Sequence, residues 1–277
     1  STLDRSSAAS DVYKRQAFAD MKALESGAVA NPDEGRMVGH YWLRNSALAP
    51  TPELKAAIDG PLADVKDFGR DVLDGRIAPP RAEQYSAALV IGIGGSALGP
   101  ELVADAIPAA GLDMFFLDNT DPDGMYRVLE SLPLEETLVV VISKSGGTPE
   151  TRNGMMVAQD FFNKHGLDFA AQAVAVTGVG SKLDKTAEAE GWLKRFPMED
   201  WVGGRTSVMS VVGLVPAVLQ GVDVDALLEG ARLMDEKTRR ECVKCNASMK
   251  LALAWYKATG GKGEKDMVVL PYKDALV

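Results

Sequence analysis

The sequence has 277 residues, of which 46% are hydrophobic and 25% charged, and its formal net charge is −9. A chain of this length can bury enough apolar surface to form one large domain or two ordinary ones without disulfides or metals. The acidic balance argues against nucleic-acid binding, which needs a cationic face, and no apolar run approaches the roughly 20 residues that cross a bilayer. Two cysteines and two histidines exclude a disulfide framework and disfavour a metal site. Because the N-terminus also lacks a secretory signal pattern, we expect a soluble, cytoplasmic protein with no nucleic-acid or membrane partner.

The N-terminal region is expected to become helical after a polar leader. Residues 1–16 are Ser-rich and show neither strand nor helix periodicity, so we interpret them as a tail or a non-native leader. Apolar residues then follow one helical stripe from Ala17 to about Ala28. The stretch Asn31–Gly35 (NPDEG) has the composition of a turn, which ends this helix.

Helical periodicity returns between Pro52 and Gly75, where apolar side chains recur every three or four residues. Gly60 and Pro61 are expected to separate two helices here, because proline removes a hydrogen bond inside a helix. The pair Pro79-Pro80 is interpreted as a linker. Residues 17–80 are therefore predicted to form an N-terminal helical segment.

After residue 80 the pattern changes to short, continuous apolar runs separated by helix-compatible stretches. A weak run lies near Trp192–Phe196. The clear runs are Ala87–Ile93, Met114–Leu117, Leu138–Ile142 and Ala173–Val176. Continuous rather than alternating hydrophobicity is typical of strands that are covered on both faces. The alternation of strand and helix therefore predicts a doubly wound α/β domain with a mainly parallel, five-stranded sheet.

The last third of the chain is predicted to be mostly helical, with a further strand at Met267–Leu270. The apolar face between Val208 and Leu219 indicates a helix buried in the core. The mixed charges of Asp235–Glu241 (DEKTRRE) are interpreted as a solvated helix face. Cys242 and Cys245 have the spacing of a redox or zinc pair, but they stand alone in a charged stretch typical of a helix, which favours a chance pair.

Chemistry is expected in the turns after the strands, because ligands of open α/β sheets bind outside the carboxyl ends of the strands. The turn Gly92–Gly99 clusters glycines ahead of a helix, so its backbone can approach an anion closely. Taken alone, this turn also fits a tight turn without a ligand. It also fits a dinucleotide site, because Asp118 closes the next strand about 20 residues further on, where a ribose-binding acid belongs.

The turn Ser143–Thr151 is more specific. Its first six residues hold three hydroxyl side chains, a lysine and two glycines, ahead of a helix whose first turn contains Pro149. Hydroxyls and backbone N–H groups at a helix start form a compact phosphate cradle. The turn lacks the Walker A pattern, which favours a phosphorylated metabolite over nucleotide hydrolysis. Ordinary N-capping would explain one hydroxyl but not three.

Three segments resemble the glucose-6-phosphate isomerase family in order and spacing: GIGGSALGP (Gly92–Pro100), SKSGGTPET (Ser143–Thr151) and WVGGRTSVMSVVGL (Trp201–Leu214). The first two belong to the family's sugar isomerase (SIS) fold, and the third is more specific to the enzyme. The resemblance covers roughly Ala17–Leu276. It implies a flavodoxin-like SIS domain with following helices over residues 81–277, whereas the family's second SIS domain is missing from this sequence.

The resemblance also implies roles for single residues. The phosphate ligands would be Ser96, Ser143, Ser145, Thr148 and the backbone N–H of Lys144. Gly95 and Gly204 would let the main chain approach the sugar. Arg205 would face the developing negative charge, and Glu150 would support catalysis by orienting a proton-transfer group.

The implied reaction interconverts glucose 6-phosphate and fructose 6-phosphate through a cis-enediolate, with no metal or organic cofactor. A fixed guanidinium suits this intermediate, and loss of one such donor typically raises a barrier by about 3–4 kcal/mol. The family's general base is a glutamate in a Met-Glu-Ser-type motif downstream of Leu270–Asp274, and no such motif occurs in this sequence. Neither His40 nor His165 stands in the context of the family's ring-opening histidine. We therefore expect a truncated chain, and a homodimer for the full-length protein.

Three alternatives remain at this stage. A non-catalytic SIS module that senses a phosphosugar would have no reason to keep the segment around Arg205. A nicotinamide-dependent oxidoreductase built on Gly92–Gly99 and Asp118 would leave the three-hydroxyl turn unexplained. An isomerase for a different phosphosugar is disfavoured by the third segment.

The sequence predicts that the 277-residue chain alone shows no measurable isomerase activity in a coupled assay, because it lacks the expected base. Turnover that persists after contaminating host isomerase has been removed would contradict this prediction.

Overall fold

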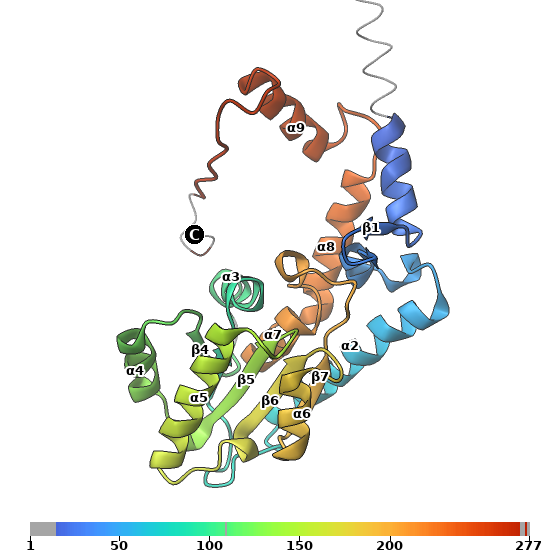
Figure 1. The fold of residues 1–277 in the computed structure, drawn as a ribbon. Coiled ribbons are helices and arrows are strands. Elements are labelled where there is room, and N and C mark those ends of the chain that lie inside the picture. Colours follow the sequence, from blue (N-terminus) through green and yellow to red (C-terminus); the bar gives the residue numbers. More distant parts are fainter. Residues whose placement is uncertain (1–14, 109, 272–274, 276–277) are drawn as a thin grey trace, which may run out of the picture.

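The computed structural model describes residues 15–108, 110–271 and 275, and its centre is a five-stranded sheet (Figure 1). All neighbouring strands in this sheet are parallel, and their order is β4-β3-β5-β6-β7. The strands are β3 (Ala87–Ile91), β4 (Asp113–Leu117), β5 (Thr137–Ser143), β6 (Ala173–Thr177) and β7 (Lys194–Pro197). The predicted flavodoxin-like α/β class is therefore confirmed, including the weak fifth strand.

The direction in which the chain adds strands reverses between β3 and β5. After β3 the chain adds β4 on one side, and it then crosses back to add β5 on the other. In register, Ile91 pairs with both Leu117 and Val141. Every residue of β3, β5 and β6 is buried, which is why these strands are apolar without alternation.

Helices cover both faces of the sheet (Figure 1). Successive residues of β5 pack on opposite faces, so that Val140 and Val141 belong to different clusters. One face carries α2 (Pro52–Leu73), α3 (Leu98–Ala106) and α7 (Val211–Gln220). The other face carries α4 (Pro122–Ser131), α5 (Pro149–Lys164) and α6 (Lys182–Ala189). As predicted, the apolar helix after Val208 lies in the core, and every residue of α7 is buried.

The expected break at Gly60-Pro61 is wrong, because α2 is one helix with Pro61 inside it. Ile58 before the proline and Val65 after it are both buried. The helix packs so closely on α7 that a Cβ on Gly69 would lie 2.6 Å from Val218. Proline removes one backbone hydrogen bond, whereas this packing stabilises the helix on both sides of it.

The N-terminal segment contains less helix than predicted. Residues 15–25 are helical, so part of the proposed leader is structured, while residues 1–14 lie outside the described residues. A hairpin that the sequence reading missed pairs β1 (Val29–Asn31) with β2 (Arg36–Met37) around the expected turn. Two 3₁₀ turns follow, η1 (His40–Arg44) and η2 (Ser46–Leu48). The expected helical segment is therefore a mixed structure that leads into α2.

The C-terminal segment consists of α8 (Val224–Thr238) and α9 (Ala247–Ala258). No residue of α9 is buried, and Figure 1 shows this helix away from the sheet, beyond the end of α8. The predicted strand Met267–Leu270 is wrong, since these exposed residues pair with no strand in the described part of the chain. Among the described helices, none combines the length and apolar character needed to cross a membrane.

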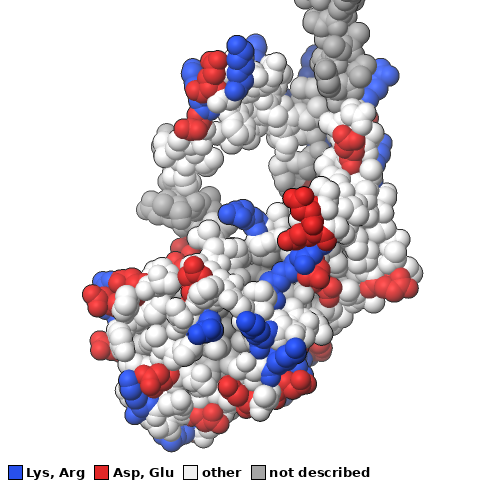
Figure 2. Space-filling view, viewed as in Figure 1, with Lys and Arg blue, Asp and Glu red and all other residues white. Residues whose placement is uncertain are grey.

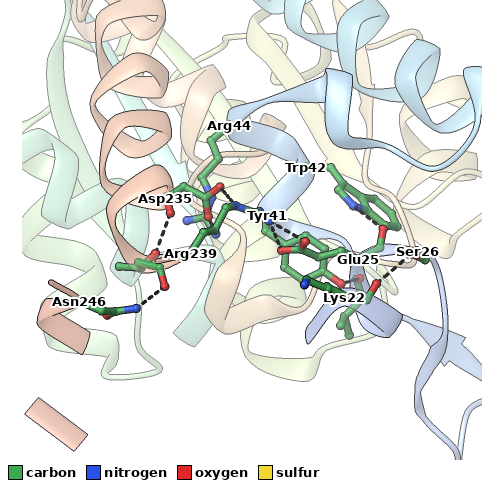
Figure 3. Close-up of polar contacts among 11 residues, drawn as sticks. Lys22, Glu25, Ser26, Tyr41, Trp42, Arg44, Asp235, Arg239 and Asn246 are labelled. Atoms are coloured by element: carbon green, nitrogen blue, oxygen red, sulfur yellow. Dashed lines mark hydrogen bonds and ion pairs between the residues drawn. The ribbon is translucent and has the colours of Figure 1, made fainter. Parts of the chain in front are cut away.

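The charged stretch Asp235–Glu241 is only in part the predicted solvated helix face, because Glu236 and Lys237 are exposed on α8 whereas Asp235 is buried. Asp235 is only 8% exposed and forms ion pairs with Arg44, at 3.2 Å, and with Arg239 (Figure 3). Arg239 in turn pairs with Glu25. The network therefore joins the N-terminal helix, η1 and α8. The burial of Asp235 was not predicted because neither Arg44 nor Glu25 is near this stretch in sequence.

Replacing Asp235 with alanine is expected to lower the free energy of unfolding by about 3 kcal/mol, because two partly buried guanidinium groups lose their shared carboxylate. Urea unfolding measures this loss. The matched control is Asp225→Ala on the same helix, whose partner Lys66 is exposed, with an expected loss below about 1 kcal/mol. Equal losses in the two variants would contradict a structural role for the Asp235 network.

Candidate functional site

The candidate site lies at the carboxyl end of the sheet, where the strand order reverses. The turn after β3 contains the 3₁₀ turn η3 (Gly94–Ser96), and the turn after β5 leads into α5. These turns leave the sheet side by side, because β3 and β5 are parallel neighbours. Such a switch point is where open α/β sheets bind their ligands.

The third turn, which contains η6 (Gly204–Thr206), packs directly on the first. A Cβ on Gly95 would lie 2.3 Å from the carbonyl oxygen of Gly204, so this approach requires glycine at position 95. The Ser207 hydroxyl lies 3.0 Å from the Gly95 carbonyl oxygen and 2.7 Å from that of Gly204. The structure thus brings together two of the sequence-predicted residues, and Ser207 joins them in a role that sequence reasoning missed.

The Lys144 side chain connects the second turn to the third. Its Nζ atom donates hydrogen bonds to the carbonyl oxygens of Asp200 (2.8 Å) and Val202 (3.1 Å), just before Gly203 and Gly204. Burial lowers the pKa of the Lys144 ammonium group, and the nearby Asp200 carboxylate, at 3.6 Å, opposes that shift. The ammonium group of Lys144 is thus hydrogen-bonded within the protein. The group of Lys144 that could still donate to a ligand is its backbone N–H.

The backbone of the second turn is held from the end of β6. The Thr177 hydroxyl donates to the Ser143 carbonyl oxygen (2.6 Å), and the Gly178 N–H donates to that of Lys144 (3.0 Å). Gly146 has a φ of +63° and lies so close to α6 that a Cβ would come within 2.2 Å of the Leu183 nitrogen. Sequence reasoning missed these supports, because they lie on the following strand and helix and no motif marks them.

The three hydroxyls of the second turn have different surroundings. Thr148 is the N-cap residue of α5, yet its side chain makes no capping hydrogen bond, so ordinary capping does not account for it. The Ser145 hydroxyl is exposed and accepts a hydrogen bond from the Gly147 N–H (3.1 Å). The Ser143 hydroxyl is buried without a partner, and Ser143 lines a 190 Å³ cavity with residues of α5 and α6.

Arg205 and Glu150 are the two residues with expected catalytic roles. Neither charged side chain forms an ion pair with another described residue. Arg205 is exposed in η6, and no hydrogen bond or ion pair joins its guanidinium to the described part of the chain. Glu150 is half-buried in the first turn of α5 and likewise has no side-chain partner within the described ranges. A structural salt bridge therefore does not explain either charge.

The electrostatics of these turns suit an oxyanion. The 16-residue helix α5 directs the N–H groups of its first turn at the second turn, where anions are stabilised.

Residues 15–108, 110–271 and 275 contain no cluster of three or more acidic, histidine or cysteine side chains that could hold a metal ion. On the face drawn in Figure 2, basic and acidic side chains are interspersed over the sheet domain. The groups of these turns that could bind an anion are backbone N–H groups, hydroxyls and one arginine.

The two histidines lie elsewhere in the fold. His165 is the C-cap residue of α5, and its Nδ1 atom lies 2.8 Å from the Phe161 carbonyl oxygen. His40 belongs to η1, where burial and the charge of Arg44 lower its pKa. His40 is half-buried, whereas His165 is exposed at the end of α5.

The parallel sheet, its strand order and the turns at its switch point define an α/β domain of the sugar isomerase (SIS) type. A family model described as phosphoglucose isomerase matches residues 7–277. The glucose-6-phosphate isomerase of Nostoc punctiforme is 60% identical over 265 residues, which cover 94% of this chain and 50% of that protein. That of Geotalea daltonii is 58% identical over 267 residues, which cover 95% of this chain and 50% of that protein.

A solved structure, the glucose-6-phosphate isomerase of Chlamydia trachomatis, matches with a TM-score of 0.77 and 28% identity, and the match covers 88% of this chain and 48% of that one. The chain therefore belongs to the phosphoglucose isomerase family. It spans about half the length of the curated relatives that it matches.

Replacing Gly95 with alanine is expected to lower the free energy of unfolding by about 2 kcal/mol, because the new methyl group must push the Gly204 backbone away. Urea unfolding measures the change. The control is Gly230→Ala, at an exposed position inside α8 where an added Cβ meets nothing within 4 Å. That substitution is expected to raise stability by about 0.5–1 kcal/mol. A Gly95→Ala chain as stable as the unmodified one would show that the two turns do not depend on this contact.

Proposed function

We propose that this chain carries the phosphate-binding turns and the charge-stabilising arginine of a glucose-6-phosphate isomerase. The observation that carries the proposal is the main-chain contact between Gly95 and Gly204. Through this contact, the turn that contains Arg205 packs on the turn after β3, at the switch point of the sheet. A domain that only senses phosphosugars needs the phosphate cradle but has no use for a guanidinium held beside it.

The phosphate is proposed to bind at the start of α5. Ser96, Ser145 and Thr148 would donate hydroxyl hydrogen bonds to its oxygens. The backbone N–H of Lys144 and the first turn of the helix would add further donors. The Ser143 hydroxyl, which is buried, would need a small movement of the turn to reach the same phosphate. Gly95 and Gly204 would let the sugar lie close to the main chain.

Arg205 is proposed to stabilise the cis-enediolate. A base removes the proton next to the carbonyl and returns it to the neighbouring carbon, and between these steps negative charge spreads over two oxygens. A planar guanidinium can donate to both oxygens and keeps its charge throughout. Because its turn is held by Ser207 and Lys144, little reorganisation is needed when the charge develops.

Proton transfer itself is proposed to depend on groups outside these 277 residues. Within the segments Gly92–Gly99, Ser143–Thr151 and Trp201–Leu214, only Glu150 carries a carboxylate, and we assign it a supporting role that orients the transferring group. The reaction needs no metal or organic cofactor. For the full-length protein we propose a cytoplasmic homodimer.

A chimera tests this function. The 277-residue chain is joined to the second half of the Nostoc punctiforme relative, and glucose 6-phosphate isomerisation is followed with a coupled dehydrogenase. We expect turnover, and we expect Arg205→Met to lower kcat by about 10²- to 10³-fold with little change in KM, because the phosphate is held by other groups.

The matched control is Arg70→Met on the exposed side of α2, which should leave kcat within about twofold because it lies outside the site. If the chimera binds glucose 6-phosphate without turning it over, the phosphosugar-sensing alternative replaces the isomerase. If Arg205→Met raises KM and leaves kcat unchanged, Arg205 binds substrate rather than the enediolate.

A further inference from the structure

Cys242 and Cys245 lie in the turn between α8 and α9, not in a helix as the sequence analysis expected. The Cys245 N–H donates a hydrogen bond to the Cys242 carbonyl oxygen (2.9 Å), which closes a β-turn. Both side chains are exposed, and their Sγ atoms are 2.8 Å apart. The turn therefore brings the two sulfur atoms within reach of each other at the surface.

The backbone around this turn is held without any help from the sulfur atoms. Asn246 is only 1% exposed, and its side-chain amide donates to the carbonyl oxygens of Thr238 (2.6 Å) and Arg240 (3.0 Å). Its Oδ1 atom accepts a hydrogen bond from the Met249 N–H (3.1 Å), which caps α9. The end of α8 and the start of α9 are thus tied together by Asn246, so the turn that brings the two sulfur atoms close does not depend on a bond between them.

We propose that Cys242 and Cys245 form a reversible dithiol–disulfide pair that low-molecular-weight disulfides oxidise. One cysteine thiolate attacks a sulfur of glutathione disulfide, forms a mixed disulfide and releases one glutathione thiolate. The second cysteine, as thiolate, attacks the protein sulfur of that mixed disulfide and releases a second glutathione. The two cysteine sulfurs are oxidised to one disulfide, the reagent is reduced to two thiols, and the two thiol protons go to solvent or to the released thiolates.

The surroundings of the pair favour this order of steps. The hydrogen bond with Cys242, together with the charge of that thiol's anion, raises the pKa of Cys245, while Arg240 and Lys250 oppose the shift. A second thiolate beside the first is therefore disfavoured, so the protons leave one at a time. One sulfur makes the first attack, and the other resolves the mixed disulfide within the same turn.

The disulfide would close a ring across the junction from which α9 starts. No residue of α9 is buried, and Leu251, Trp255 and Tyr256 are exposed, so the direction of this helix depends on its junction with α8. Oxidation would stiffen that junction while leaving the sheet and its turns untouched. The inference is independent of the proposed isomerase function.

The test uses the full 277-residue chain, equilibrated in buffers of reduced and oxidised glutathione, quenched with acid and measured by intact mass spectrometry. The expected product has lost two hydrogen atoms, carries no glutathione and returns to the starting mass on reduction. Trypsin cleaves after Lys244, between the two cysteines, so the oxidised chain should yield residues 241–244 and 245–250 as one disulfide-linked pair.

Two comparisons make the outcome decisive. Cys242→Ser and Cys245→Ser should each stop at one bound glutathione, because no resolving thiol remains. The folded chain should form its disulfide at an effective concentration about tenfold or more above that of the urea-denatured chain, since the turn already holds the sulfurs together. Equal effective concentrations in folded and denatured chains, bis-glutathionylated chains, or disulfide-linked dimers as the main product would overturn the proposal.

Discussion

The main-chain contact between Gly95 and Gly204 is the constraint on which the candidate site depends. The two backbones can approach this closely only because residue 95 carries no Cβ, which would lie 2.3 Å from the Gly204 carbonyl oxygen, and Ser207 then bonds to both carbonyl groups. Arg205 follows directly in the chain, so its position is set by this contact. Backbone packing thus places the turn that carries Arg205 beside the switch point of the sheet, with no salt bridge to the Arg205 side chain among the described residues.

Polar side chains stabilise this protein both near the candidate site and far from it. Near the site, the Lys144 side chain donates to two carbonyl groups ahead of the third turn, and Thr177 supports the second turn from β6. Far from the site, Asp235 joins η1 to α8 through two arginines. In each case a charged or hydroxyl side chain binds a group from another part of the sequence: backbone carbonyl groups near the site, and guanidinium groups at Asp235.

The resemblance of three short segments to one enzyme family was confirmed over nearly the whole chain. The strands could be predicted because a buried parallel sheet leaves continuous apolar runs. The two turns with anion-binding composition could be predicted because they follow those strands directly. Two of the errors have a common physical origin. Pro61 was read as a helix break and Asp235 as solvated, and in both cases contacts with distant segments overrode the local pattern. Cys242 was read as helical, whereas the buried Asn246 side chain holds a turn there by binding the Arg240 carbonyl group.

By itself, the sequence determined the α/β class, the five strands and the turns with anion-binding composition, because these depend on residues close together in the chain. Only the tertiary structure decided that Gly95 meets Gly204, that Lys144 points at the third turn and that Cys242 faces Cys245. The local sequence pattern determines where helices, strands and turns form, because hydrophobic periodicity and turn chemistry act over a few residues. The site needs segments more than 100 residues apart in the chain, and only the packing of the sheet and its helices brings them together.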